Sequence, residues 1–112
     1  MKLPNAVRAI VDLGKVRDYL LNAGHPDNGG KARFFVGLGF SLGDPVRLVG
    51  ALHGIALSGD VVQQAESRHG AKYVVDGLLE SPRGKLPMVR TIWIVDSAQD
   101  LPRLVTAYPH EE

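Results

Sequence analysis

The chain lacks cysteine altogether, has few aromatic residues and carries almost no net charge. Without cysteine it can form neither a disulfide framework nor a thiolate metal site, which is compatible with a reducing compartment. No apolar run approaches the roughly 18 residues of a membrane-spanning helix, and the N-terminus lacks the apolar core of a signal peptide. We therefore expect a cytoplasmic protein that does not enter a membrane.

What the chain does contain is typical of a globular protein. Its 112 residues are 45% hydrophobic and 22% charged, a composition that favours one domain, residues 1–112, with a core of its own. The formal net charge is +1, but the two halves differ. Residues 1–57 carry seven Lys and Arg against four Asp and Glu, and residues 58–112 carry six against eight. A basic first half is compatible with a polyanionic partner.

The first half contains the signals for about three helices. Apolar residues recur at helical spacing, and Asp12 and Asp44, the latter followed by Pro45, stand in N-cap positions. Phe-Phe-Val in the middle segment would also suit a strand, but the Gly39 that follows favours the end of a helix. The expected helices are residues 13–22, 31–38 and 45–57; residues 1–11 and the Gly-rich stretch 23–30 are expected to be irregular.

In the second half the apolar residues change to a period of two, which is typical of strands. Turns that contain Gly or Pro separate the runs, and the tail after Pro109 is expected to be frayed. The expected strands are residues 71–80, 87–95 and 103–108, with an ambiguous segment at 61–67 that would form an edge strand.

This order of elements predicts an α+β fold. About three N-terminal helices would pack on one face of a C-terminal antiparallel β-meander of three to four strands, leaving the other face free to carry a site. Polar residues interrupt the last two strands: Arg90 and Thr91 in one, Thr106 and Tyr108 in the next. Because Arg90 and Thr91 are consecutive, they face opposite sides of the sheet unless a bulge intervenes. The register of the two strands therefore decides which of them lies on the same face of the sheet as Thr106 and Tyr108.

Several kinds of chemistry have little support in the sequence. The four histidines, at positions 25, 53, 69 and 110, do not have the spacing of a metal site. The chain has no phosphate-binding glycine motif and no nucleophile elbow. We therefore expect no metal and no cofactor, and we interpret His53, His69 and His110 as surface or solvated residues.

What remains is a set of cationic and hydroxyl groups that suits phosphodiester chemistry. His25 and Lys31 flank a glycine-rich loop at a helix start. A lysine at the N-terminus of a helix is unfavourable with the helix dipole, so its presence there favours a functional role. Cleavage of RNA requires a base for the 2′-hydroxyl, a cation for the charged transition state and an acid for the leaving oxygen. Histidine, lysine, arginine and tyrosine suit these roles. The candidates also have ordinary structural interpretations; the threonines, for example, are residues that favour strands.

Short motifs spread over nearly the whole chain resemble a bacterial, toxin-associated domain family. The motifs are LPNA (3–6), DYLLN (18–22), HP (25–26), KARFF (31–35), LGF (38–40), YVVD (73–76), VRTIWIV (89–95) and PRLVTAY (102–108). Members of this family occur as small stand-alone proteins, often beside a very small antitoxin candidate, and as C-terminal tips of polymorphic toxins. The family distantly resembles metal-independent ribonucleases of the barnase, EndoU, colicin and RelE type.

The resemblance implies a metal-independent endoribonuclease toxin that cleaves RNA by attack of the 2′-hydroxyl. Its partners would be the RNA substrate and a small cognate antitoxin; the oligomeric state stays open. The implied catalytic residues are His25, Lys31, Arg90, Thr106 and Tyr108, and the implied substrate contacts are Arg33, Thr91, Trp93 and Tyr73. The chain departs from such toxins in being nearly neutral and in offering only His25 among the matched motifs. The alternative is a non-enzymatic antitoxin, immunity protein or protein-binding module that uses the same sheet face.

Overall fold

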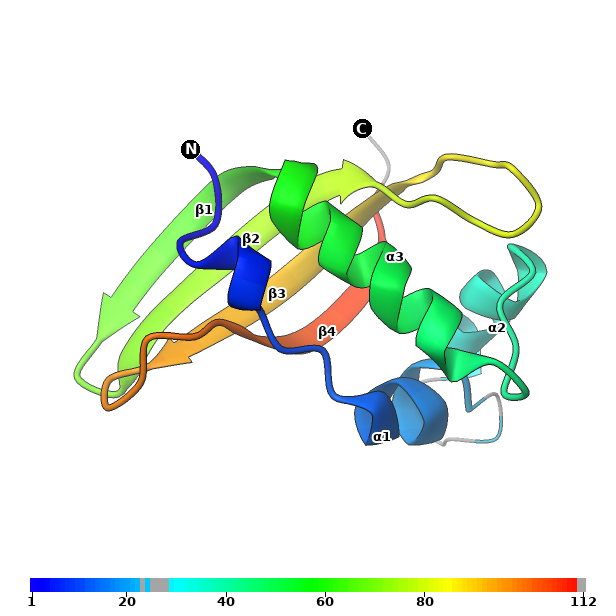
Figure 1. The fold of residues 1–112 in the computed structure, drawn as a ribbon, viewed down its shortest axis with the longest axis horizontal. Helices are drawn as coiled ribbons and strands as arrows, with labels where there is room; N and C mark the ends of the chain where they lie inside the picture. The colour runs from blue at the N-terminus through cyan, green and yellow to red at the C-terminus, as the bar shows by residue number, and fades with distance from the viewer. Residues whose placement is uncertain (23, 25–28, 111–112) are drawn as a thin grey trace.

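The computed structural model describes residues 1–22, 24 and 29–110 and confirms the predicted α+β class. Helical elements come first, and a four-stranded antiparallel sheet follows (Figure 1). The helical elements are η1 (Ala6–Arg8), α1 (Leu13–Lys15), η2 (Val16–Leu20), α2 (Gly29–Gly37) and α3 (Pro45–Ser58). The strands are β1 (Asp60–Ser67), β2 (Gly70–Leu78), β3 (Met88–Asp96) and β4 (Arg103–Pro109).

The first predicted helix forms as its N-cap indicates. Asp12 Oδ1 accepts a hydrogen bond from the backbone N–H of Lys15 at 2.9 Å. After α1 the winding widens into the π-helical η2, where the N–H of Leu21 bonds to the oxygen of Val16 at 2.9 Å. Residues 6–8, expected to be irregular, form the 3-10 turn η1, which is too short to leave a periodic pattern in the sequence.

The other two helices also follow their sequence signals. The buried side chains of α2 include Ala32 and Phe35, and the segment is a helix rather than the competing strand. α3 starts at Pro45 as predicted, although the preceding aspartate makes no capping hydrogen bond. Immediately after α3 the chain passes close to β2: a Cβ on Gly59 would lie 2.7 Å from the backbone oxygen of Asp76. Only glycine fits there, so α3 is held tightly against the sheet.

The strands pair in the order β1-β2-β3-β4, each antiparallel to its neighbour. This is the predicted meander, with the ambiguous 61–67 segment as an edge strand. Asp76 of β2 lies opposite Arg90 of β3, and Arg90 lies opposite Tyr108 of β4. A bulge in β4 leaves Val105 with no opposite residue on β3. Thr106 and Tyr108, beyond the bulge, share one side of the sheet.

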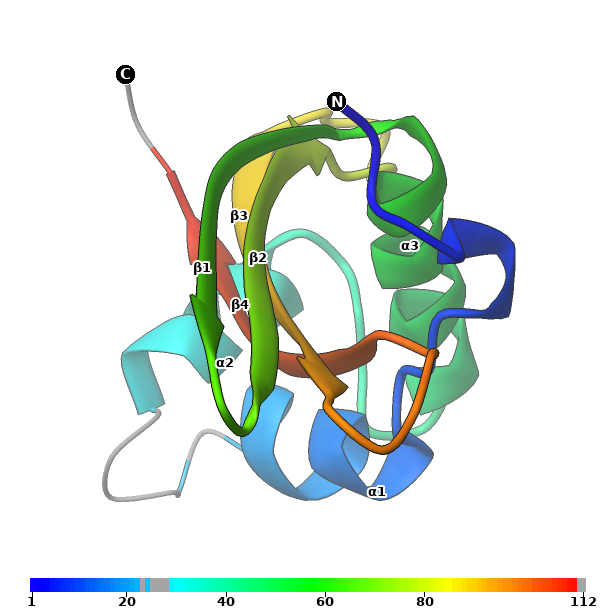
Figure 2. The same ribbon diagram turned by 90° about the vertical axis from the view of Figure 1, so that its left-hand side faces the viewer.

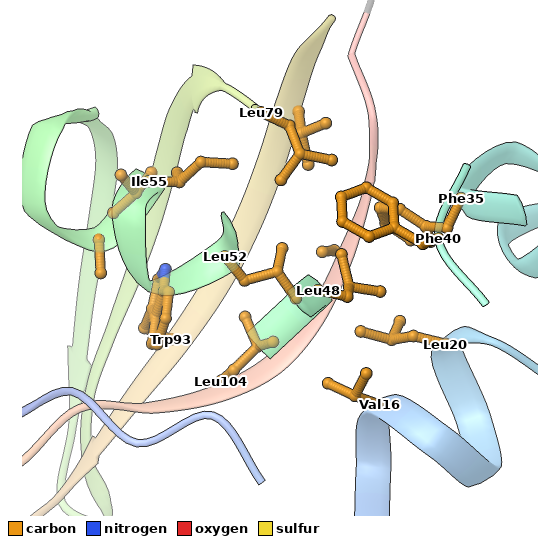
Figure 3. Packing of buried hydrophobic residues seen from close by; sticks show 14 of the residues in the cluster. Val16, Leu20, Phe35, Phe40, Leu48, Leu52, Ile55, Leu79, Trp93 and Leu104 are labelled. Carbon is orange, nitrogen blue, oxygen red and sulfur yellow. The ribbon is translucent and has the colours of Figure 1, made fainter. Parts of the chain in front are cut away.

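The sheet therefore has two unlike faces. α3 and the N-terminal segments cover what we call the inner face (Figures 1 and 2). There Leu48 and Leu52 of α3 meet Trp93 of β3 and Leu104 of β4 in the hydrophobic core (Figure 3). The opposite, outer face carries the alternate residues of each strand, and α2 lies beside β4. None of the helices in the described part of the chain has the length and apolar character needed to cross a bilayer.

Candidate functional site

A row of polar side chains crosses the outer face, one from each of three strands. Arg90 donates from Nε and Nη2 to the two carboxylate oxygens of Asp76, at 2.8 and 2.9 Å. The two side chains are 27% and 13% exposed, so this bidentate ion pair is partly shielded from water. Its hydrogen bonds lower the pKa of Asp76 below the usual 3.8 and raise the pKa of Arg90. Tyr108, opposite Arg90 on β4, raises the pKa of Arg90 further.

His110 completes this row, although it was expected in a frayed tail. Its backbone N–H donates to the oxygen of Met88 at 3.1 Å, which continues the pairing of β3 and β4 past Pro109. Its Nε2 lies 3.2 Å from Arg90 Nη2 and 3.7 Å from Asp76 Oδ2. The side chain is 29% exposed. The imidazole is thus a fixed part of the outer face and not a solvated end group.

Lys31 approaches the same face from α2. Its Nζ donates to Thr106 Oγ1 at 3.0 Å. The ammonium also lies 5.6 Å from the ring centroids of both Tyr19 and Tyr108, which is the range of a cation–π contact. These contacts explain why a lysine stands near the N-terminus of α2, where the helix dipole disfavours a cation: its ammonium interacts with two aromatic rings and a hydroxyl.

Lys15 supports this region from the edge of the sheet. Its Nζ donates to the backbone oxygens of Val105 at 2.9 Å and Leu104 at 3.4 Å. These carbonyls belong to the bulged part of β4, directly before Thr106. The hydrogen bonds fix the strand that presents Thr106 and Tyr108 to Lys31.

We call the residues that meet here the outer-face cluster. Its members are Lys31, Asp76, Arg90, Thr106, Tyr108 and His110. Lys31 and Arg90 bring two positive charges and Asp76 one negative charge, so the cluster has an excess positive charge when the imidazole is neutral. Its hydroxyls and N–H groups are all potential donors to an anion.

The register separates the other predicted site residues from this cluster. Thr91 is fully buried on the inner face, where its Oγ1 donates to Val75 O at 2.8 Å and accepts from Trp93 Nε1 at 2.7 Å. Trp93 and Tyr73 are buried on that face as well. Arg33 is exposed on α2. His25 lies outside the described residues.

Sequence reasoning missed Asp76, His110 and Tyr19. A signal was present for the first two. Asp76 is a charge in the middle of an apolar strand, and His110 follows Tyr108 at the strand period of two, so both could have been assigned to one face. Tyr19 joins the site only because η2 and α2 pack together, and that contact has no sequence pattern.

A separate hollow of about 460 Å³ lies at the other end of the outer face, beside the turn between β1 and β2. Lys72, Ile94 and Arg103 line it, and Arg103 pairs there with Asp96 at 3.1 Å. No member of the outer-face cluster lines this hollow. The cluster is the more chemically specific feature, because its groups are partly buried and hydrogen-bonded to one another. Within the described residues, no three His, Asp or Glu side chains form a group that could hold a metal ion.

The fold is α+β, and the cationic, hydroxyl-bearing cluster on its outer sheet face is a candidate site. The chain belongs to the family described as domain of unknown function (DUF6883), whose model matches residues 2–111. A comparison with curated proteins finds no match. Among solved structures, the chain is similar to one chain of the contact-dependent growth inhibition toxin–immunity protein complex from Klebsiella pneumoniae 342. The TM-score is 0.73 at 19% identity, covering 96% of this chain and 97% of that one, which shows a shared fold.

Proposed function

We propose that this protein is a metal-independent endoribonuclease toxin of a bacterial toxin–antitoxin or polymorphic toxin system, acting in the cytoplasm. Its partners would be an RNA substrate and a small cognate antitoxin. One observation carries the proposal: Lys31, Arg90, Thr106 and Tyr108 meet on the outer face although α2 and the last two strands are far apart in the sequence. The solved structure of similar fold belongs to a toxin–immunity complex, which supports a role in such a system.

The proposed reaction is attack of the RNA 2′-oxygen on the adjacent phosphorus. The 2′-O–P bond forms, the bond from phosphorus to the 5′-oxygen breaks, and a 2′,3′-cyclic phosphate remains. Arg90 and Lys31 would bind the phosphate oxygens, whose charge grows in the transition state. Thr106 would position Lys31 through their hydrogen bond. Tyr108 would donate to a phosphate oxygen or stack on a base.

A second candidate is a non-enzymatic antitoxin, immunity protein or protein-binding module. Two observations favour it. The Arg90 guanidinium is already paired with Asp76, as in a structural ion pair. In addition, the similar solved structure contains an immunity protein as well as a toxin. In this case the same outer face would bind another protein instead of RNA.

Expression without a neighbouring antitoxin separates these candidates. The toxin should arrest growth of a bacterial host and degrade its RNA, and the purified protein should cleave RNA in the presence of a metal chelator. A double variant, Lys31→Ala with Arg90→Ala, should lower cleavage at least about 10²–10³-fold, the effect of removing one transition-state donor. Circular dichroism and urea unfolding establish that the variant is folded.

The matched control removes two positive charges elsewhere on the outer face, by Lys72→Ala with Arg103→Ala. This control should remain toxic, because neither residue belongs to the cluster. A harmless wild-type protein that leaves RNA intact in the cell and in the purified assay would support the non-enzymatic candidate. Equal toxicity of the Lys31/Arg90 variant would show that the site is elsewhere.

A further inference from the structure

Sequence and comparisons assign no role to two members of the outer-face cluster, Asp76 and His110, and Asp76 is the ion-pair partner of Arg90. The Nε2 of His110 lies near two charged groups, Arg90 at 3.2 Å and Asp76 at 3.7 Å, and the side chain remains 29% exposed. Resting on the function proposed above, we propose that His110 is the catalytic base for the 2′-hydroxyl, and that binding of the substrate phosphate to Arg90 frees it to act.

The contact with Arg90 fixes how the resting ring is protonated. A guanidinium carries only donors, so Nε2 of His110 must be the acceptor in this hydrogen bond. In this arrangement the neutral ring therefore carries its proton on Nδ1. The lone pair that would accept a substrate proton is occupied by Arg90 as long as no anion is bound.

A phosphate changes this arrangement. Arg90 Nη2 has two hydrogens, one directed to Asp76 Oδ2 and the other to His110 Nε2. An anionic phosphate oxygen is a stronger acceptor for a guanidinium N–H than a neutral imidazole. A phosphate oxygen can therefore replace the imidazole at the second hydrogen, while the bidentate pair with Asp76 holds Arg90 in place. The Nε2 lone pair is then free beside the bound substrate.

Members of the cluster can supply both proton transfers that the cleavage reaction requires. The 2′-hydroxyl proton passes to His110 Nε2 as the 2′-O–P bond forms. The P–O bond to the 5′-oxygen breaks, and that oxygen takes a proton from the Lys31 ammonium. Exchange of protons with water then restores neutral His110 and charged Lys31. The protonated ring also has an opposite charge nearby, because Nε2 lies 3.7 Å from Asp76 Oδ2.

Charged and titratable groups from three strands surround His110. The charged or titratable groups that face it are Asp76 on β2, Arg90 on β3 and Tyr108 on β4, with Lys31 beyond the Tyr108 ring. Asp60, the neighbour of Asp76 on β1, is paired with Lys2 at 3.0 Å. A phosphate bound to Arg90 adds a negative charge beside the ring.

The test is single-turnover cleavage of an RNA oligonucleotide with one ribonucleotide in a deoxy background, measured across pH. His110→Gln keeps an acceptor for Arg90 but cannot act as a base at neutral pH, so it distinguishes catalysis from a structural role. His110→Gln and His110→Ala should each lower the cleavage rate by about 10²–10⁴-fold and remove the acid limb of the pH profile. Added imidazole should partly rescue His110→Ala.

His69→Ala, a change in the exposed turn between β1 and β2, is the control and should cleave like the wild type. His25→Ala tests the competing base in the same assay. The proposal is overturned if His110→Gln retains the wild-type rate and pH profile, or if His25→Ala alone removes the acid limb. Either result leaves the ribonuclease function intact. A wild-type protein without cleavage at any pH would instead refute the proposed function and this inference together.

Discussion

Arg90 and Thr91 are neighbours on β3, yet the two faces of the sheet give them opposite roles. Thr91 is fully buried, and its single hydroxyl both donates to Val75 and accepts from Trp93. Both of these hydrogen bonds are made inside the protein, and the hydroxyl has no donor left. Arg90 is partly exposed and shares its donors between Asp76 and His110. The comparison shows that burial and spare donors distinguish a polar residue that stabilises the fold from one that can meet a ligand.

The two faces also differ in charge. Thr91 is the only polar side chain among the buried residues in the described part of the chain, and the remainder of that core is hydrophobic. The outer face places Lys31, Arg90 and Asp76 within one cluster, and these groups keep contact with water. A charge is tolerable there because it is paired and partly hydrated, and the same hydration makes it available to an anion.

The strongest way to test the comparison is to remove the largest inner-face side chain. Trp93 is fully buried and packs in the hydrophobic core (Figure 3). Trp93→Ala should lower the free energy of unfolding by about 3–5 kcal/mol, because it leaves a cavity and removes the donor to Thr91 Oγ1. Ile94→Ala, one residue further on the outer face, should cost about 1–2 kcal/mol. Urea unfolding measures both, and equal costs would contradict the assignment of the faces.

Much of this architecture follows from local sequence signals. The Asp12 cap, Pro45 at the start of α3 and the period of two in the strands each act within a few residues, so they predict elements correctly. The alternation also predicts that Arg90 and Thr91 oppose each other. The site is different because it depends on distant contacts: Lys31 and Thr106 are 75 residues apart in the chain.

The bulge at Val105 shows why the sequence alone does not predict the register of β3 and β4. One extra residue in β4 changes which side chains of the following run share a face. Sequence alternation alone gives no position for such a bulge. Thr91, Trp93 and Tyr73 have side chains whose chemistry suits the site, but the regular pairing of β2 and β3 places them in the interior.

A second test concerns the ion pair of the outer face. The pKa of Asp76 lies below the unperturbed 3.8 because Arg90 hydrogen-bonds to the carboxylate. The ionised form is therefore favoured by folding, so its contribution to stability is complete above 3.8 and is lost as pH falls through the lowered value. Asp76→Asn should cost about 1.5–3 kcal/mol near neutral pH. The difference from the wild type should shrink in acid, as urea unfolding at several pH values would show.

The control for this test is the second Arg–Asp pair on the outer face. Arg103 and Asp96 are 47% and 41% exposed, so water screens their attraction. Asp96→Asn should change the free energy of unfolding by less than about 1 kcal/mol. If both asparagine variants behaved alike, partial burial would not make the Asp76–Arg90 pair stronger than the exposed Asp96–Arg103 pair. The two ion pairs of the outer face would then contribute equally to stability.

The finest test makes one chemical change on each face. Thr91→Val removes the hydroxyl that pairs with Trp93 Nε1 and should lower the free energy of unfolding by about 1–2 kcal/mol, since a buried donor loses its partner. RNA cleavage by the folded variant should be unchanged.

The matching change on the outer face is Thr106→Val. It removes the hydrogen-bond partner of Lys31 at a half-buried position, where water can replace the lost hydrogen bond. Its stability should change by less than about 0.5 kcal/mol, while cleavage falls because Lys31 is no longer positioned. Urea unfolding and single-turnover cleavage measure the two effects. If Thr106→Val instead lost stability and kept its cleavage rate, the contact with Lys31 would serve the fold and the two faces would not differ in role.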